Sequence, residues 1–208
     1  METHLNRNVF DQVARDYESI HNRSLPPGVQ SADFINQRAE KVTRWILNGY
    51  TGQEFCYLDF GCGNGRMLKC LLASEPLRPL LKKGHLRLFG FDTSIESIHA
   101  AQSLMGDASV RLVSDWRELP TEIRFDFVIG CHVFHHIPPA ERATVANSLH
   151  RRMTPASKLV IWEHNPFNPM ARLLVKICPF DADARLLTPN DFGVVSAAAA
   201  AAAAASRN

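Results

Sequence analysis

Hydrophobic positions along the chain follow two alternating periods. Short runs rich in β-branched and aromatic residues predict five strands, at residues 55–60, 86–92, 109–113, 125–130 and 157–163. Between them lie segments long enough for crossover helices, which are expected at residues 65–73, 94–105 and 139–153. Strands that alternate with helices pair in parallel through right-handed crossovers. The pattern therefore predicts an α/β fold, a doubly wound and mainly parallel sheet with helices on both faces.

Two more helices are predicted before the first strand. The stripe formed by Phe10, Val13, Tyr17 and Ile20 indicates the first, which a Pro-Pro-Gly sequence ends. The second, at residues 31–48, is expected to open with a serine cap and to be ended by a glycine. Its inward residues are expected to be Phe34, Ile35, Val42, Trp45 and Ile46.

The composition narrows the class of protein. An apolar content of 46% and a charged content of 21% are those of a globular domain. A net charge of +2, with scattered basic residues, gives no support for nucleic-acid binding. No apolar run approaches the roughly 18 residues of a membrane span, and no signal peptide opens the chain. We therefore expect a cytoplasmic protein without membrane partners, as a monomer or homodimer.

Five cysteines are present, an odd number without a C-x-x-C pair, so free thiols are expected rather than disulfides or structural zinc. Nine consecutive alanines occupy positions 197–205. This run has no apolar face distinct from a polar one. We interpret residues 197–208 as an unassigned or artefactual tail and leave it out of the fold prediction.

A glycine-rich turn follows the first predicted strand. Asp59 and Phe60 lead into Gly61-Cys62-Gly63-Asn64-Gly65, and a helix begins directly afterwards. Glycines let the backbone turn sharply and let a ligand approach where a Cβ would collide. The dinucleotide fingerprint has a different spacing, G-x-G-x-x-G. An acid at the strand end suits a ligand with an amino group better than a pyrophosphate.

Two more acids follow the next two strands. Asp92 ends the second strand, where a carboxylate accepts hydrogen bonds from ribose hydroxyls. Asp115, with Trp116 beside it, follows the third strand, where an acceptor and an apolar wall would meet adenine. Singly, the glycine loop is also compatible with a plain turn, and Asp115 with a helix cap. Together they indicate an adenosine that carries an amino-acid tail.

The motifs LDFGCGNG, LFGFDTS, SDW and FDFVIGCHVFHHIP resemble successive motifs of class I S-adenosylmethionine-dependent methyltransferases, over about residues 55 to 165. The resemblance implies a Rossmann-like fold, S-adenosylmethionine as cofactor and S-adenosylhomocysteine as product. FDQVARDYE resembles the lid helix of such enzymes. Residues 1–50 are therefore expected to form a helical lid and first covering helix, and residues 51–196 the core. The family's last two strands are not found in the sequence.

The resemblance also implies roles for single residues. Asp59 would lie near the methionine amine, Gly61 to Gly65 would line methionine and ribose, and Asp92 would hold the ribose hydroxyls. Asp115 and Trp116 would flank adenine. The remaining residues expected at the cofactor are Cys62, Thr93, Cys131 and Tyr17. Arg38 is either a further contact to the cofactor's carboxylate end or a solvated charge.

Catalysis needs alignment of acceptor and methyl, and a proton acceptor assists it. His135 and His136, after the fourth strand, are the candidate bases, with His136 preferred; the alternative is a structural role before Pro138. Glu163 is a further catalytic candidate after the fifth strand. The acceptor is expected to contact His136 and the two residues that follow Glu163, unless these only fix a turn; they are His164 and Asn165.

No metal site is expected. His132 is assigned a structural role, and apart from Cys131 no carboxylate or cysteine lies at ligand spacing near the three histidines. The leading hypothesis is a methyltransferase for a small-molecule or sugar- or lipid-linked acceptor. One rival is a non-catalytic module that binds S-adenosylmethionine. The other is a nicotinamide-dinucleotide oxidoreductase, which the glycine spacing and Asp59 disfavour.

Overall fold

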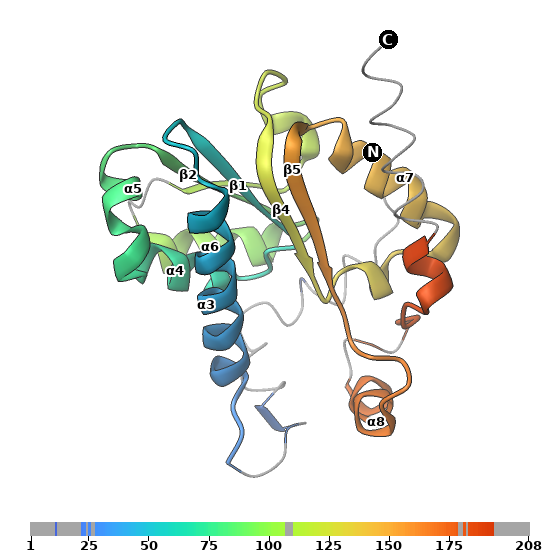
Figure 1. The fold of residues 1–208 in the computed structure, drawn as a ribbon. Coiled ribbons are helices and arrows are strands. Elements are labelled where there is room, and N and C mark those ends of the chain that lie inside the picture. Colours follow the sequence, from blue (N-terminus) through green and yellow to red (C-terminus); the bar gives the residue numbers. More distant parts are fainter. Residues whose placement is uncertain are drawn as a thin grey trace.

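The structure, a computed structural model, describes residues 11, 22–23, 25, 28–106, 110–178, 181 and 183–193. Its sheet contains five parallel strands in the order β3-β2-β1-β4-β5. Their bounds are β1 Phe55–Phe60, β2 Leu86–Phe91, β3 Val110–Val113, β4 Phe125–Cys131 and β5 Met153–Trp162. The doubly wound α/β fold predicted from the sequence is confirmed (Figure 1). The strand order reverses between β1 and β4, and a ligand crevice is expected outside their carboxyl ends.

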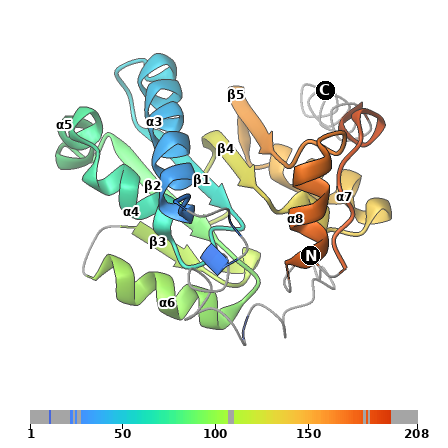
Figure 2. The ribbon, with the colours of Figure 1, turned by 90° about the horizontal axis from the view of Figure 1, so that it is seen from below.

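Helices cover both faces of this sheet (Figures 1 and 2). One group packs on the face that also carries the crossovers between β1, β2 and β3: α3 Ser31–Gly49, α4 Arg66–Ala73 and α6 Ile95–Met105. On the other face lies α7, Pro139–His150, which joins β4 to β5. The helix α8, Pro169–Ile177, lies beyond the carboxyl end of β5 (Figure 1).

Successive residues of β1 enter two different cores. Leu58 and Phe60 pack in one cluster with apolar residues of α7, whereas Tyr57 packs in the other with residues of α3 and α4. All six residues of β1 are buried, as expected for the central strand of a sheet covered on both sides. The carboxyl end of β1 is therefore held rigidly from both faces.

Several predicted boundaries need correction. Ser31 is a buried residue inside α3 rather than its cap. The cap is Gln30, whose N–H donates to the Asp33 carboxylate at 3.1 Å. Phe34, predicted to point inward, is 39% exposed and lines the cavity described below.

The predicted helix 139–153 ends early, and β5 starts at Met153, four residues before the predicted strand. Phe125 pairs with Met153, but Phe127 pairs with Lys158, so the intervening residues bulge out of the sheet. Pro155 lies in this bulge, because proline cannot donate a ladder hydrogen bond. Because of this proline, the sequence pattern does not indicate the first part of the strand.

The short helices η1 Glu75–Leu77, α5 Arg78–Lys82, η2 Trp116–Glu118 and η3 Phe134–His136, and also α8, were not predicted. The stripe that predicts the first helix, Phe10, Val13, Tyr17 and Ile20, lies outside the described residues. Within the described ranges, the chain contains no helix with the length and apolar character of a membrane span. The five cysteines are free thiols, as predicted.

Candidate functional site

A cavity of about 520 Å³ opens at the carboxyl ends of β1 and β4. Its walls come from α3, the glycine turn, the ends of β2, β4 and β5, and α8. One end is formed by Asp59, the glycine turn and Asp92, and we call it the glycine end. The other end contains four histidines and two acids, and we call it the histidine end; its residues are His132, His135, His136, Glu163, His164 and Asp181.

The glycine turn depends on backbone conformations that favour glycine. Gly61, Gly63 and Gly65 have φ angles of 75°, 53° and 79°. A Cβ on Gly61 would lie 2.2 Å from Cγ2 of Val133, whereas one on Gly63 would meet no atom within 4 Å. Gly61 is therefore required for packing between β1 and β4. Gly63 faces open space in the cavity, where a ligand can approach the bare backbone.

Asp92 lies beside the glycine turn. The N–H of Gly63 donates to its Oδ2 at 2.8 Å, and the N–H of Ser94 donates to its Oδ1 at 2.9 Å. Burial raises the pKa of Asp92, and these two hydrogen bonds oppose the rise. The carboxylate joins the end of β2 to the turn after β1. Each of its oxygens has a second lone pair for a ligand hydroxyl.

Asp59 is 3% exposed at the carboxyl end of β1. Burial and the neighbouring charge of Asp92 raise its pKa to about 7, against a smaller opposing effect of Arg38. Two carboxylates thus share one largely apolar space. Such a pair favours a cationic ligand, because a positive charge offsets the cost of burying them.

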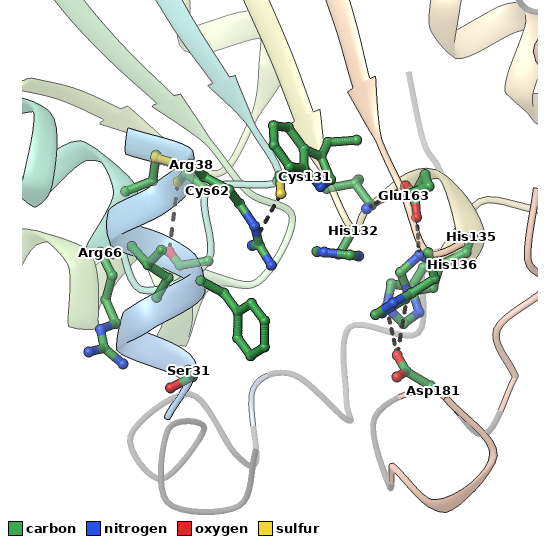
Figure 3. Close-up of a pocket in the computed structure, with 18 of the residues that line it drawn as sticks. Ser31, Arg38, Cys62, Arg66, Cys131, His132, His135, His136, Glu163 and Asp181 are labelled. Atoms are coloured by element: carbon green, nitrogen blue, oxygen red, sulfur yellow. Dashed lines mark hydrogen bonds and ion pairs between the residues drawn. The ribbon is translucent and has the colours of Figure 1, made fainter. Parts of the chain in front are cut away.

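Arg38 reaches the cavity from α3, and its Nη1 lies 3.3 Å from Sγ of Cys131 (Figure 3). Cys62, Thr93 and Cys131 also line the cavity. Burial raises the pKa of Cys131 to about 12 and that of Cys62 well above its usual value. Both cysteines are therefore neutral thiols that shape the wall.

Asp115 and Trp116 do not belong to the described residues that line the cavity. The carboxylate of Asp115 accepts hydrogen bonds from the backbone and guanidinium of Arg117 at 2.8 and 2.9 Å, and it caps η2. The ring of Trp116 packs edge-on against Phe60 and Phe91. The contact of these two residues with adenine stays a prediction, and so does the contact of Tyr17 with the cofactor's carboxylate end.

His135 is the centre of the histidine end (Figure 3). Its side chain is 1% exposed; Nδ1 lies 2.5 Å from Oε2 of Glu163, and Nε2 lies 3.4 Å from Oδ1 of Asp181. Burial alone would lower the pKa of His135, but the two carboxylates outweigh it and raise the pKa to about 9. With both nitrogens facing carboxylates and no ion bound, His135 is an imidazolium at neutral pH and a poor candidate base.

Glu163 connects β5 to the loop after β4. Its Oε1 accepts hydrogen bonds from the N–H groups of Val133 and Phe134 at 3.0 and 2.7 Å, while Oε2 faces His135. Both oxygens are thus engaged within the protein. Glu163 therefore acts as a positioning residue for η3 and for the ring of His135.

His136 and His164 line the cavity next to this network. Nε2 of His136 lies 3.3 Å from Oδ1 of Asp181. Burial and the charge of His135 lower the pKa of His136 to about 4, and the same two effects lower the pKa of His164. Both rings are neutral at pH 7. Asn165 also lines the cavity, and its Oδ1 accepts a hydrogen bond from the N–H of Phe167 at 2.9 Å.

His132 stands where the two ends of the cavity meet (Figure 3). It is the one non-glycine residue of the described chain with a positive φ, 56°. Its ring packs on that of His164 with centroids 4.1 Å apart. A left-handed histidine is uncommon, so the fold around the tip of β4 must hold it in place.

Two residues that shape this site were not identified from the sequence. Asp181 lies 45 positions beyond His136 and completes the histidine end. Arg142, on α7, is 2% exposed; it donates to the carbonyl of Ile137 at 3.0 Å and to Asp191 at 3.0 Å. An arginine in a predicted helix usually lies on the surface, so no local signal identifies Arg142 as a buried residue.

Comparisons with known proteins agree with this geometry. The family model described as "Methyltransferase domain" matches residues 58–159, which include the glycine turn, Asp92 and η3. No curated protein matches the chain in sequence.

Solved structures of methyltransferases share the fold. Magnesium protoporphyrin IX methyltransferase from Synechocystis PCC 6803, with bound S-adenosylhomocysteine, is 19% identical, with a TM-score of 0.58 over 92% of this chain and 87% of that one. The plantazolicin methyltransferase BpumL, in complex with a desmethyl-plantazolicin analogue and S-adenosylhomocysteine, is 19% identical, with a TM-score of 0.57 over 91% and 74%.

A third structure is the amino pentose methyltransferase CalS10 from Micromonospora echinaspora, with bound S-adenosylmethionine. It is 18% identical, with a TM-score of 0.52 over 74% of this chain and 57% of that one. At these identities the likeness shows the shared fold. Residues 58–159 match the methyltransferase domain, and the strand order and fold of the chain are those of class I S-adenosylmethionine-dependent methyltransferases.

Proposed function

We propose that the chain transfers the methyl group of S-adenosylmethionine to a small-molecule acceptor that enters at the histidine end. The observation that carries this proposal is the pair of carboxylates Asp59 and Asp92 on either side of the open backbone at Gly63. An amino-acid amine, a sulfonium and a ribose diol are the groups that such a space suits.

The residues of the glycine end fit each part of this cofactor. Asp59 is 3% exposed, and its pKa is raised because Arg38 opposes the effects of burial and of Asp92 only in part. An ammonium group beside Asp59 would supply the positive charge that offsets the rest. The second lone pairs of the Asp92 carboxylate are suited to two ribose hydroxyls, and Gly63 leaves room for the chain that joins them.

The lining around the histidine end favours a small-molecule acceptor. It combines the neutral rings of His136 and His164 with Asn165 and the apolar side chains of Leu174 and Val175 from α8. Methyl transfer breaks the bond from sulfur to methyl while the acceptor's oxygen or nitrogen forms a new one. The electron pair stays on sulfur, and the acceptor releases its proton. The protein's main task is to align the reacting atoms at about 3 to 3.5 Å with water excluded.

Calorimetry on the purified chain tests the cofactor assignment. S-adenosylhomocysteine should bind with one site per chain, and a nicotinamide dinucleotide should not bind. A chain that binds the dinucleotide and ignores S-adenosylhomocysteine would contradict the proposal.

A screen for labelled-methyl transfer to small-molecule extracts tests catalysis. Asp92→Ala, which should weaken the cofactor site, serves as the control for methyl transfer that depends on this pocket. Cofactor affinity without transfer to any extract would point instead to a non-catalytic binding module.

A further inference from the structure

We propose that His135, His136 and Asp181 form a binding site for a divalent first-row transition-metal ion at the histidine end. One donor atom from each residue lies within 4.8 Å of the others. Oδ1 of Asp181 lies 3.4 Å from Nε2 of His135 and 3.3 Å from Nε2 of His136. Figure 3 shows both rings directed at the same carboxylate.

The spacing of these donor atoms fits a shared ion. Nitrogen and oxygen ligands about 2.1 Å from a tetrahedral ion lie about 3.4 Å apart. Hydrogen bonds between a charged N–H and a carboxylate are shorter, about 2.7 to 2.9 Å. The 3.3 and 3.4 Å separations at Asp181 match the first arrangement and exceed the second.

Glu163 orients His135 for this role. It faces Nδ1 of His135 at 2.5 Å and is itself fixed by the N–H groups of Val133 and Phe134. A carboxylate on the nitrogen that does not bind metal is the usual support of a metal-binding histidine, because it fixes the ring and its tautomer. Since both oxygens of Glu163 are engaged in this way, the alternative donor group of His132, His135 and Glu163 is less suited to an ion.

Hydrogen bonds to Arg185 hold the chain near Asp181 against η3 and the start of α7. The N–H of Arg185 donates to the carbonyl of His135 at 2.8 Å, which ties the segment after Asp181 to η3. The buried guanidinium of Arg142 holds both partners, since it donates to the carbonyls of Ile137 and Arg185. The three proposed ligands therefore belong to one fixed unit, although they come from two distant parts of the chain.

Two imidazoles and one carboxylate leave coordination positions open, and imidazole ligands favour ions such as Zn²⁺ or Co²⁺ over Mg²⁺. An ion there would hold an oxygen of the acceptor and lower its pKa; this role, unlike the site itself, rests on the proposed function. The sequence alone predicts no metal site, because no carboxylate lies at ligand spacing near the histidines. The fold supplies Asp181 and Glu163 from elsewhere.

Titration of the full chain with Zn²⁺ and, separately, with Co²⁺ tests the site after treatment with a chelator. We expect one ion per chain by calorimetry and a visible Co²⁺ absorption typical of nitrogen and oxygen ligands. Asp181→Asn and His136→Ala should each weaken binding at least about 100-fold, beyond the 10- to 100-fold expected for the supporting Glu163→Gln. His99→Ala should change nothing, because this 62%-exposed histidine, 3.7 Å from Glu96, lies outside the cavity.

S-adenosylhomocysteine affinity is measured on every sample and shows that each variant is folded. Absence of saturable ion binding in the wild type, or unchanged binding in either ligand variant, overturns the ion site. If Asp181→Asn also loses S-adenosylhomocysteine binding, His136→Ala decides the question. If the wild type binds the ion but does not bind S-adenosylhomocysteine, only the proposed function is contradicted. The two failures can therefore be told apart.

Discussion

The N–H of Gly63 donates a hydrogen bond to Oδ2 of Asp92 at 2.8 Å, so that one carboxylate fixes the turn after β1 from the end of β2. Asp92→Ala removes this support and the predicted partner of the ribose. We expect S-adenosylhomocysteine affinity to fall at least about tenfold, from a loss of roughly 1.5 to 3 kcal/mol. Calorimetry at constant pH measures it, and an unchanged dissociation constant would refute the role of Asp92.

The raised pKa of Asp59, about 7, predicts a pH-dependent affinity. The cofactor's ammonium group pairs with the ionised carboxylate, and below the pKa this carboxylate is protonated. Affinity for S-adenosylhomocysteine should therefore be about tenfold higher at pH 8 than at pH 6. Asp59→Asn should bind more weakly at pH 8 and show a flat profile. A wild-type profile that is equally flat would exclude Asp59 as the amine's partner.

The same pKa gives a prediction for stability. Between about pH 4 and pH 7 the folded protein retains a proton on Asp59 that the unfolded chain has lost. The contribution of Asp59 to the free energy of unfolding therefore falls as the pH rises through this window, and it is constant above it. At pH 8, without ligand, Asp59→Asn should be more stable than the wild type in urea unfolding. At pH 4 this difference should disappear.

His136→Ala should leave S-adenosylhomocysteine affinity within about twofold of the wild type and slow methyl transfer about 100-fold. The acceptor found by the labelled-methyl screen provides the assay. A chelator applied to the wild type separates two explanations. Equal slowing assigns the effect to a bound ion, and an unaffected rate assigns it to the imidazole. An undiminished rate in the variant would leave His136 with a structural role only.

Arg142→Gln should destabilise the fold. The change removes the donor of the carbonyls of Ile137 and Arg185 and the hydrogen bond to Oδ1 of Asp191. A loss of about 2 kcal/mol or more is expected, which lowers the melting temperature by roughly 4 to 8 °C for a chain of this size. Arg151→Gln, at an exposed position just after α7, is the matched control. Equal melting temperatures for the two variants would contradict this account.

Two glycines of the turn, Gly61 and Gly63, should differ in their response to alanine. Gly61→Ala should destabilise the fold, because its Cβ would overlap Val133. Gly63→Ala meets no protein atom, so its main effect should be a loss of S-adenosylhomocysteine affinity beyond the strain of a positive φ. Gly52→Ala, also at positive φ with open space around it, controls for that strain. Equal affinity of Gly63→Ala and Gly52→Ala would place the ligand elsewhere.

The glycine end could be predicted because it is local in the sequence. Asp59, Gly61 and Gly63 lie within five positions, and Asp92 ends the next strand of a fold whose alternation is plain. The histidine end could not, because its charges pair across long separations. Glu163 lies 28 positions from His135, and Asp181 lies 45 positions from His136. Hydrophobic periodicity carries no information about such pairs, nor about the short helices around them.

The start of β5 at Met153 could not be predicted from the sequence pattern either. A proline in a polar stretch predicts a loop, yet β5 lies at the edge of the described sheet and tolerates the missing donor. Neighbouring structure, rather than local propensity, decides the start of this strand.

The cavity draws its two ends from different stretches of the chain, the glycine end from residues before position 100 and much of the histidine end from residues after Trp162. Replacement of the chain beyond β5 would exchange Glu163, His164, Asp181 and α8 on one side of the acceptor, and it would leave the glycine end and the three histidines after β4 in place. Changes in this segment alone would therefore alter which acceptor fits, without touching the residues proposed to hold the cofactor.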